Sequence, residues 1–172
     1  GHIYDSGDFK KNLSNCLEMS GYETFHERKK ISQEKDKCRG IGISTYIEAC
    51  GGGGPEYSSV RIGGNGNVEV KIGTQSNGQG HATSYAQIVS EVLQIDINEI
   101  SLIQGNSIEI KNGSGTGGSR SMPVGGNALY LASNKLLNNA KLSLAKYFKA
   151  KPVEISYKEG FFEFKNKYIS FS

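Results

Sequence analysis

The sequence predicts an α+β fold: a mixed sheet with a hairpin, two glycine-rich strand-to-helix turns, and a long C-terminal helix followed by short strands. Two observations support this class. Apolar residues recur every three or four positions in some segments and every second position in others, and helices do not alternate regularly with strands. With 172 residues, 36% of them hydrophobic, the chain is also long enough to bury a core.

Residues 1–40 are expected to form an N-terminal helical segment. A first helix is predicted over 6–20, because its apolar residues share one face and Ser6 or Asp8 can cap it. A second, very polar helix is predicted over 23–39, and its few apolar residues suggest that it lies on a surface.

The remaining residues, 41–172, are expected to form a second subdomain that begins with strands. The period of two predicts a strand over 41–47. Two further strands, 59–63 and 68–72, flank Asn65-Gly66, and that dipeptide is typical of a hairpin turn.

The next elements return to a helical period. A helix is predicted over 81–94, then a strand over 100–104, a polar loop over 105–118 and a long helix over 121–148 whose first turn accommodates Pro123. Three short strands are predicted to follow, over 153–157, 161–164 and 168–171.

Charge and cysteine content exclude several function classes. The net charge is only +3, and the eight lysines within 135–172 fit a solvated face better than a nucleic-acid surface. Cys16, Cys38 and Cys50 form no CxxC pair, so we expect free thiols, no metal site and a cytoplasmic location. No apolar run approaches the ~20 residues of a membrane span, so no membrane partner is expected.

Glycine is over-represented, at 23 residues, and it gathers at two turns that open helices. The first turn is Gly78-Gln79-Gly80-His81, and the second covers 113–121. Bare backbone N–H groups at a helix N-terminus bind anions, so the pair of turns favours a phosphate-bearing ligand over ordinary tight turns. Arg120 adds a donor fork that suits phosphate.

Named nucleotide motifs fit the second turn poorly. The glycines at 113, 115 and 118 satisfy GxGxxG, but no acidic residue follows at ~20 residues, and Ser119-Arg120 stands where a Walker lysine is needed. Gln79 suits recognition of a heterocycle or an oxo group, or it is a solvated loop residue. His81 is expected to be a hydrogen-bonding residue rather than a base or ligand, and Glu56 is interpreted as structural.

Five stretches together resemble the large, molybdopterin-binding subunit of the molybdenum hydroxylases, the family of xanthine dehydrogenase, aldehyde oxidase and aerobic carbon monoxide dehydrogenase. They are YDSGDF (4–9), RGIGISTYIEACGGGGPE (39–56), GQGHATSYAQIVSEVL (78–93), SLIQGNS (101–107) and GSGTGGSRSMPVGG (113–126). The bacterial carbon monoxide dehydrogenase-like branch is the nearest in pattern.

The resemblance implies a molybdopterin cofactor, in which the dithiolene holds the molybdenum, and leaves open the cytosine dinucleotide form. Carried over position by position, it implies cofactor binding by Gly78, Gln79, Gly80, His81, Gly118, Ser119, Arg120 and Ser121. It implies 41–172 as the molybdopterin-binding subdomain and no catalytic residue in this chain.

The departures from the family indicate a fragment. Family large subunits are several times longer and carry a Gly-x-Gly-Glu loop whose Glu is the base, yet this sequence has no Gly-Glu dipeptide. We therefore expect no turnover by the chain alone. The implied partners are the remainder of the large subunit, iron–sulfur and FAD subunits or domains, and a small-molecule substrate. The alternatives are a non-enzymatic domain that binds a nucleotide or phosphate ligand and an interaction scaffold with empty turns.

Overall fold

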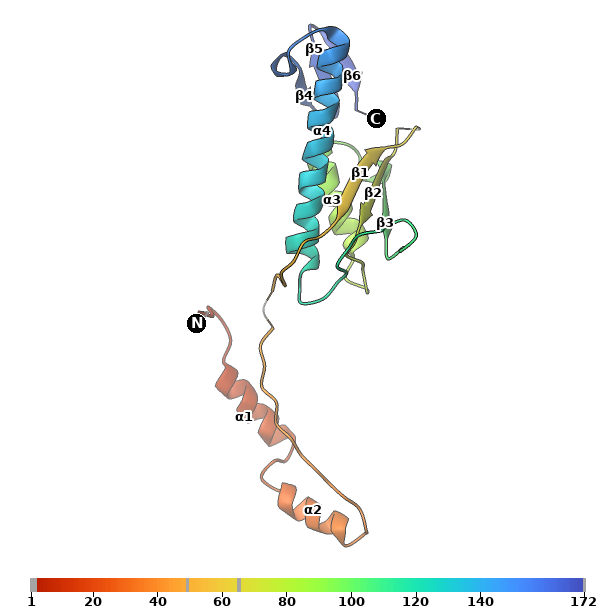
Figure 1. The fold of residues 1–172 in the computed structure, drawn as a ribbon. Coiled ribbons are helices and arrows are strands. Elements are labelled where there is room, and N and C mark those ends of the chain that lie inside the picture. Colours follow the sequence, from red (N-terminus) through yellow and green to blue (C-terminus); the bar gives the residue numbers. More distant parts are fainter. Residues whose placement is uncertain (1–2, 49, 65, 172) are drawn as a thin grey trace. The chain divides into compact units, whose positions relative to one another are not determined.

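The computed structural model describes residues 3–48, 50–64 and 66–171. It divides into two compact units, Gly1–Ile47 and Glu48–Ser172, which are described separately here (Figure 1). The boundary given by the contacts thus follows Ile47, whereas the sequence suggested residue 40.

The first unit contains two helices, α1 (Phe9–Met19) and α2 (Phe25–Gln33). Asp8 caps α1 by accepting a hydrogen bond from the Lys11 amide at 2.9 Å, as one of the two predicted caps. The second helix is shorter than predicted: Glu34 is its C-cap and is still helical in backbone, but Asp36 reaches a φ of 53°, which a continuing helix does not allow.

The strand predicted over 41–47 is wrong. This stretch is irregular, and no strand of the described residues pairs with it. Its alternating apolar side chains remain largely in solvent, with Ile43 at 53% and Tyr46 at 89% exposure. A strand is stabilised by a hydrogen-bonded neighbour, so the period of two alone did not suffice here.

The second unit is built on a three-stranded mixed sheet of order β1-β2-β3. Its strands are β1 (Ser58–Ile62), β2 (Val68–Ile72) and β3 (Ile100–Gln104). The predicted hairpin is confirmed, because β1 and β2 pair antiparallel and Gly66 has a φ of +87°. Asn65 lies outside the described residues.

The strands β2 and β3 pair in parallel, and α3 (His81–Leu93) connects them. After α3, a short 3₁₀ turn (Ile97–Glu99), which Asp96 caps, leads into β3. This crossover brings the end of β2 and the start of α3 to one end of the sheet.

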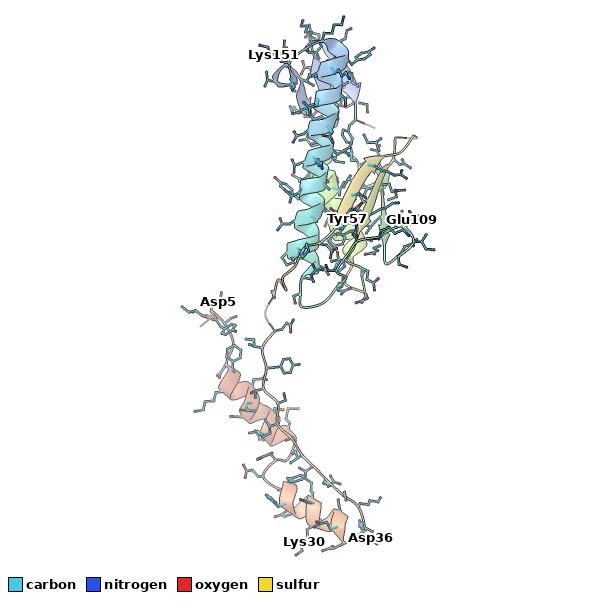
Figure 2. The ribbon with its side chains drawn as sticks, viewed as in Figure 1. Asp5, Lys30, Asp36, Tyr57, Glu109 and Lys151 are labelled. Atoms are coloured by element: carbon cyan, nitrogen blue, oxygen red, sulfur yellow. The ribbon has the colours of Figure 1, made fainter. Side chains whose placement is uncertain are left out.

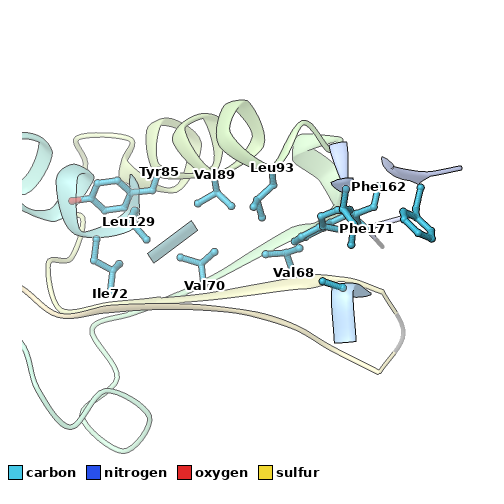
Figure 3. Close-up of a cluster of buried hydrophobic side chains, with 12 residues drawn as sticks. Val68, Val70, Ile72, Tyr85, Val89, Leu93, Leu129, Phe162 and Phe171 are labelled. Atoms are coloured by element: carbon cyan, nitrogen blue, oxygen red, sulfur yellow. The ribbon is translucent and has the colours of Figure 1, made fainter. Parts of the chain in front are cut away.

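The core lies between β2, α3 and the long helix α4 (Asn127–Phe148), as Figure 3 shows. Alternate side chains of β2 are fully buried, and α3 supplies Tyr85, Val89 and Leu93. Two further apolar residues of α3, Ile88 and Val92, are partly buried against this core. The opposite face of β2 is polar, and Lys71 Nζ lies 2.5 Å from Glu109 Oε2. Glu109, labelled in Figure 2, belongs to the loop after β3.

The predicted long helix is confirmed, although its first turn, Ser121–Gly126, has π-helical hydrogen bonds. A second antiparallel sheet follows, from β4 (Ser156–Lys158), β5 (Phe161–Phe164) and β6 (Lys167–Ser170). Its first strand starts later than predicted, because Pro152–Glu154 forms a 3₁₀ turn. None of the helices in the described residues has the length and apolar character needed to cross a bilayer.

We predict that the stability of this second sheet depends on pH in the alkaline range, because of Tyr157 in β4. Its hydroxyl donates to the Leu93 carbonyl, and burial raises its pKa to about 12 from the ordinary tyrosine value of 10.0. Because the unfolded chain loses this proton first, the free energy of unfolding should fall as pH rises from about 10 to 12.

Denaturant unfolding of the wild type and Tyr157→Phe measures this contribution as the difference between the two proteins. The stability advantage of the wild type should be constant below about pH 10 and shrink above it. An advantage that stays unchanged up to about pH 12 would show that the pKa of Tyr157 is not raised.

Candidate cofactor site

The first glycine-rich turn joins the end of β2 to the start of α3. Gly78 and Gly80 have φ values of +108° and +76°, in the region that favours glycine, and a Cβ at either would meet open space. Gly80 is the N-cap of α3 and supplies no side-chain hydrogen bond. The first N–H groups of a helix lack intrahelical partners, so this helix start is open to an anion.

The second turn covers 113–121, and its last residue, Ser121, opens the π-helical start of α4. Gly118 and Ser119 both adopt left-handed backbone, at φ values of +54° and +52°. For Ser119, which has a Cβ, this conformation is strained and must be held by its surroundings. Gly115 and Gly117, like the glycines of the first turn, have open space where a Cβ would be.

Hydrogen bonds join the two turns directly. The Thr116 hydroxyl donates to the Gln75 carbonyl at 2.7 Å and accepts from the Gln75 amide at 2.9 Å. From α3, the Tyr85 hydroxyl donates to the Ser121 carbonyl at 3.0 Å. The structure thus places the two groups of sequence-predicted residues on adjoining loops of one unit.

Arg120 faces the protein interior, with 6% of its surface exposed. Nη1 bonds the Glu56 carboxylate at 2.5 Å and the Gly115 carbonyl at 2.7 Å, while Nη2 donates to the Pro55 carbonyl at 2.8 Å. The guanidinium fork therefore binds protein groups. In this structure its direct effect is to hold the second turn in shape.

Glu56, interpreted from the sequence as structural, is the carboxylate that pairs with Arg120, and the sequence did not indicate this pairing. Its side chain is fully buried, and its Oε1 also accepts from the amides of Tyr57, at 2.8 Å, and Ser114, at 3.2 Å. One carboxylate thus links the start of β1 to the second turn. No local pattern indicated which groups it would bind, because Ser114 and Arg120 are 58 and 64 positions away.

The glycines before β1 also belong to this arrangement. The Gly51 amide donates to the Ser119 carbonyl at 3.2 Å, and the Gly52 amide donates to the Gly118 carbonyl at 2.8 Å. A Cβ at Gly52 would lie 2.9 Å from the Gly118 oxygen. Two of these glycines thus support the strained part of the second turn.

Gln79 and His81 occupy different environments. The Gln79 amide oxygen accepts from the Asn77 amide and lies 3.4 Å from the Ser76 hydroxyl, so it is turned into its own loop. His81 is 4% exposed and stacks on Tyr85 with ring centroids 5.0 Å apart. Its Nδ1 is buried and has no hydrogen-bond partner in the described part of the chain.

No group of three or more histidine, cysteine or acidic residues that could hold a metal ion occurs in the described residues, and all three cysteines are exposed. The donor set at the turns is instead backbone N–H, hydroxyl, amide and imidazole. Such donors suit phosphate and heterocycle atoms rather than a bare cation.

Comparisons with known proteins place the chain in a class of cofactor-binding domains. Residues 15–172 match the family model of the molybdopterin cofactor-binding domain. Over 162 residues the chain is 33% identical to the carbon monoxide dehydrogenase large chain of Afipia carboxidovorans, covering 84% of this chain and 20% of that one. It is 28% identical over 173 residues to the nicotine 6-hydroxylase large subunit of Paenarthrobacter nicotinovorans, covering 94% and 21%.

A solved structure agrees. The Cu,Mo-CO dehydrogenase in its carbon monoxide-reduced state matches with a TM-score of 0.67 and 30% identity, over 99% of this chain and 24% of that chain. This chain therefore belongs to the molybdopterin cofactor-binding domain family. It corresponds to a fragment of a molybdenum hydroxylase large subunit, and spans about a fifth of the length of the curated relatives it matches. The predicted family and fold class are confirmed.

Proposed function

We propose that the two glycine-rich turns hold the pterin and phosphate parts of a molybdopterin between them. The observation that carries this proposal is the pair of adjoining loops whose bare glycine backbone faces open space, one of them at an uncapped helix start. The buried, unpartnered Nδ1 of His81 at the same helix start fits a ligand with hydrogen-bonding heteroatoms.

The proposed binding residues take different roles. Backbone N–H groups at Gly80 and His81 suit phosphate oxygens, and Gln79 has its amide nitrogen available as a donor once its oxygen is bound within the loop. The Gly78 N–H donates to the Ser76 hydroxyl at 3.2 Å, so Gly78 contributes by leaving open space where a Cβ would be. On the second turn, Gly118 and Ser119 present backbone N–H groups, and Ser119 also presents its hydroxyl. Ser121, whose hydroxyl and carbonyl are bonded within the protein, acts with Arg120 through the shape of that turn. The bound group would supply the molybdenum centre at which substrate is oxidised.

The larger protein to which this fragment would belong is proposed to be a molybdenum-dependent oxidoreductase. It would transfer water-derived oxygen to an aldehyde, a purine-like heterocycle or carbon monoxide, together with iron–sulfur and FAD subunits or domains and the remainder of the large subunit. The cytosine dinucleotide form of the cofactor and a cytoplasmic location belong to the same proposal. Because the sequence contains no Gly-Glu dipeptide, the fragment is proposed to bind cofactor without turnover.

The test is to incubate the purified chain with molybdopterin, remove unbound ligand, and oxidise the protein to release a fluorescent pterin. Retention of about one pterin per chain supports the proposal. Micromolar binding of ATP or NAD with no retained pterin would instead favour the nucleotide- or phosphate-binding domain. Retention of neither would favour the scaffold.

Gly78→Ala is expected to abolish pterin retention, because the methyl group would enter the open space at the first turn and strain a φ of +108°. Gly54→Ala is the matched control, since Gly54 has a φ of +97° and open space as well, but lies outside the two turns. Both variants should lose about 1–2 kcal/mol of stability from the backbone strain. Equal pterin retention by the two variants would contradict the assignment of the first turn.

A further inference from the structure

The hydroxyl of Tyr85 lies at the point where the two turns meet beneath the proposed site. Tyr85 is fully buried in the second turn of α3, and its Oη is 2.7 Å from the Thr74 hydroxyl and 3.0 Å from the Ser121 carbonyl. A phenol has one proton, and it is donated to Ser121, so the Thr74 hydroxyl donates to Tyr85. Thr74 lies just beyond β2, and Ser121 opens the π-helical turn.

These bonds close into a ring. The Ser121 hydroxyl is 3.0 Å from the Thr116 hydroxyl, which donates its own proton to the Gln75 carbonyl, so Ser121 is the donor of that pair. Gln75 follows Thr74 in the chain, which completes the circuit from the first turn to the second and back. Burial raises the pKa of Tyr85, partly opposed by its hydrogen bonds to Thr74 and Ser121, so the hydroxyl remains a proton donor at neutral pH.

The ring of Tyr85 also contacts the first turn. His81 stacks on it at 5.0 Å with an interplanar angle of 28°, and the buried Nδ1 without a partner belongs to this stacked imidazole. On the other side, Gly125 leaves space for the network: a Cβ there would lie 2.7 Å from the Thr74 hydroxyl and 3.1 Å from that of Tyr85. The Tyr85 side chain thus contacts His81 at the start of α3, where the ligand is proposed to bind. It also contacts the Ser121 carbonyl, which anchors the second turn.

We propose that Tyr85 is a positioning residue that fixes the second turn against the first, so that a molybdopterin held by both turns binds more tightly than separate turns would allow. The inference rests on the function proposed above. It assigns to Tyr85 no contact with the cofactor, and its effect is exerted through Ser121 and His81.

Tyr85→Phe removes only the hydroxyl and leaves the ring that stacks on His81. Tyr157→Phe is the matched control, because it also removes a tyrosine hydroxyl that donates to a carbonyl, here that of Leu93, away from the two turns. Both variants should lower the melting temperature to a similar degree. Only Tyr85→Phe should weaken molybdopterin binding, by about tenfold for one hydrogen bond.

A second readout needs no cofactor. Hydrogen exchange of the amides in 117–121 should accelerate in Tyr85→Phe and remain as in the wild type in Tyr157→Phe. Thr74→Val removes the neighbouring hydroxyl with little change of shape and should produce the same acceleration, which keeps the test decisive if Tyr85→Phe folds poorly.

The outcomes separate the two proposals. If the wild type binds no molybdopterin but exchange at 117–121 accelerates as expected, the proposed function fails while the positioning role of Tyr85 stands. Unchanged exchange at 117–121 in both Tyr85→Phe and Thr74→Val would overturn the inference. So would equal molybdopterin affinity of Tyr85→Phe and Tyr157→Phe.

Discussion

Arg120→Met should destabilise the second unit by about 3–5 kcal/mol, because it leaves the buried Glu56 carboxylate without its cation. The Glu56 side chain is fully buried and bonds Arg120 at 2.5 Å, so water cannot replace the lost partner without opening the loops. The same substitution also frees the carbonyls of Pro55 and Gly115, which Arg120 bonds at 2.8 and 2.7 Å.

Urea unfolding of Arg120→Met, Glu56→Gln and the double variant measures the coupling. Removing both charges should recover a large part of the loss, because a buried ion pair replaced as a whole is often close to neutral. Strictly additive losses from the two single variants would contradict the description of these residues as a coupled buried pair. Pterin retention should follow stability in all three proteins, because the pair shapes the second turn.

Gly73→Ala is expected to have a comparable effect, about 3 kcal/mol or more, through overpacking of backbone against backbone. A Cβ at Gly73 would lie 2.5 Å from the Cα of Gly113 and 2.1 Å from Oε1 of Glu56. Neither group can retreat easily, because Gly113 begins the second turn and Glu56 is held by Arg120. The methyl group would therefore push the second turn away from the end of β2.

Gly53→Ala is the control for Gly73→Ala. No atom lies within 4 Å of a Cβ at Gly53, and its backbone is not left-handed, so the change should be neutral or slightly stabilising. Thermal and urea unfolding of the two variants gives the comparison. A loss below about 1 kcal/mol for Gly73→Ala would show that the loops relax more easily than their contacts indicate.

Local sequence patterns correctly predicted the elements that depend mainly on interactions between residues close together in the chain. Helix α3 and the hairpin followed from periodicity and turn chemistry, and the two glycine-rich turns were placed correctly at helix starts. The errors arose where a partner decides the outcome. Residues 41–47 alternate like a strand, but no described strand pairs with them.

The internal supports of the site could not be predicted from one sequence, because they join residues far apart in the chain. Glu56 and Arg120 are 64 positions apart, and Tyr85 and Ser121 are 36 apart. Arg120 was assigned to phosphate by its donor fork alone, whereas the fold directs that fork toward Glu56, Gly115 and Pro55. The residue type correctly indicated a side chain that binds anionic or carbonyl oxygens. The direction in which that side chain points depended on packing, which one sequence does not reveal.

Hydrogen exchange of the wild-type chain with and without molybdopterin tests most directly whether both turns hold the cofactor. Molybdopterin should slow exchange at 78–82 and at 117–121 together, and leave α1 and α2 unchanged. Slowing at only one turn, or at neither, would contradict a site built from the two.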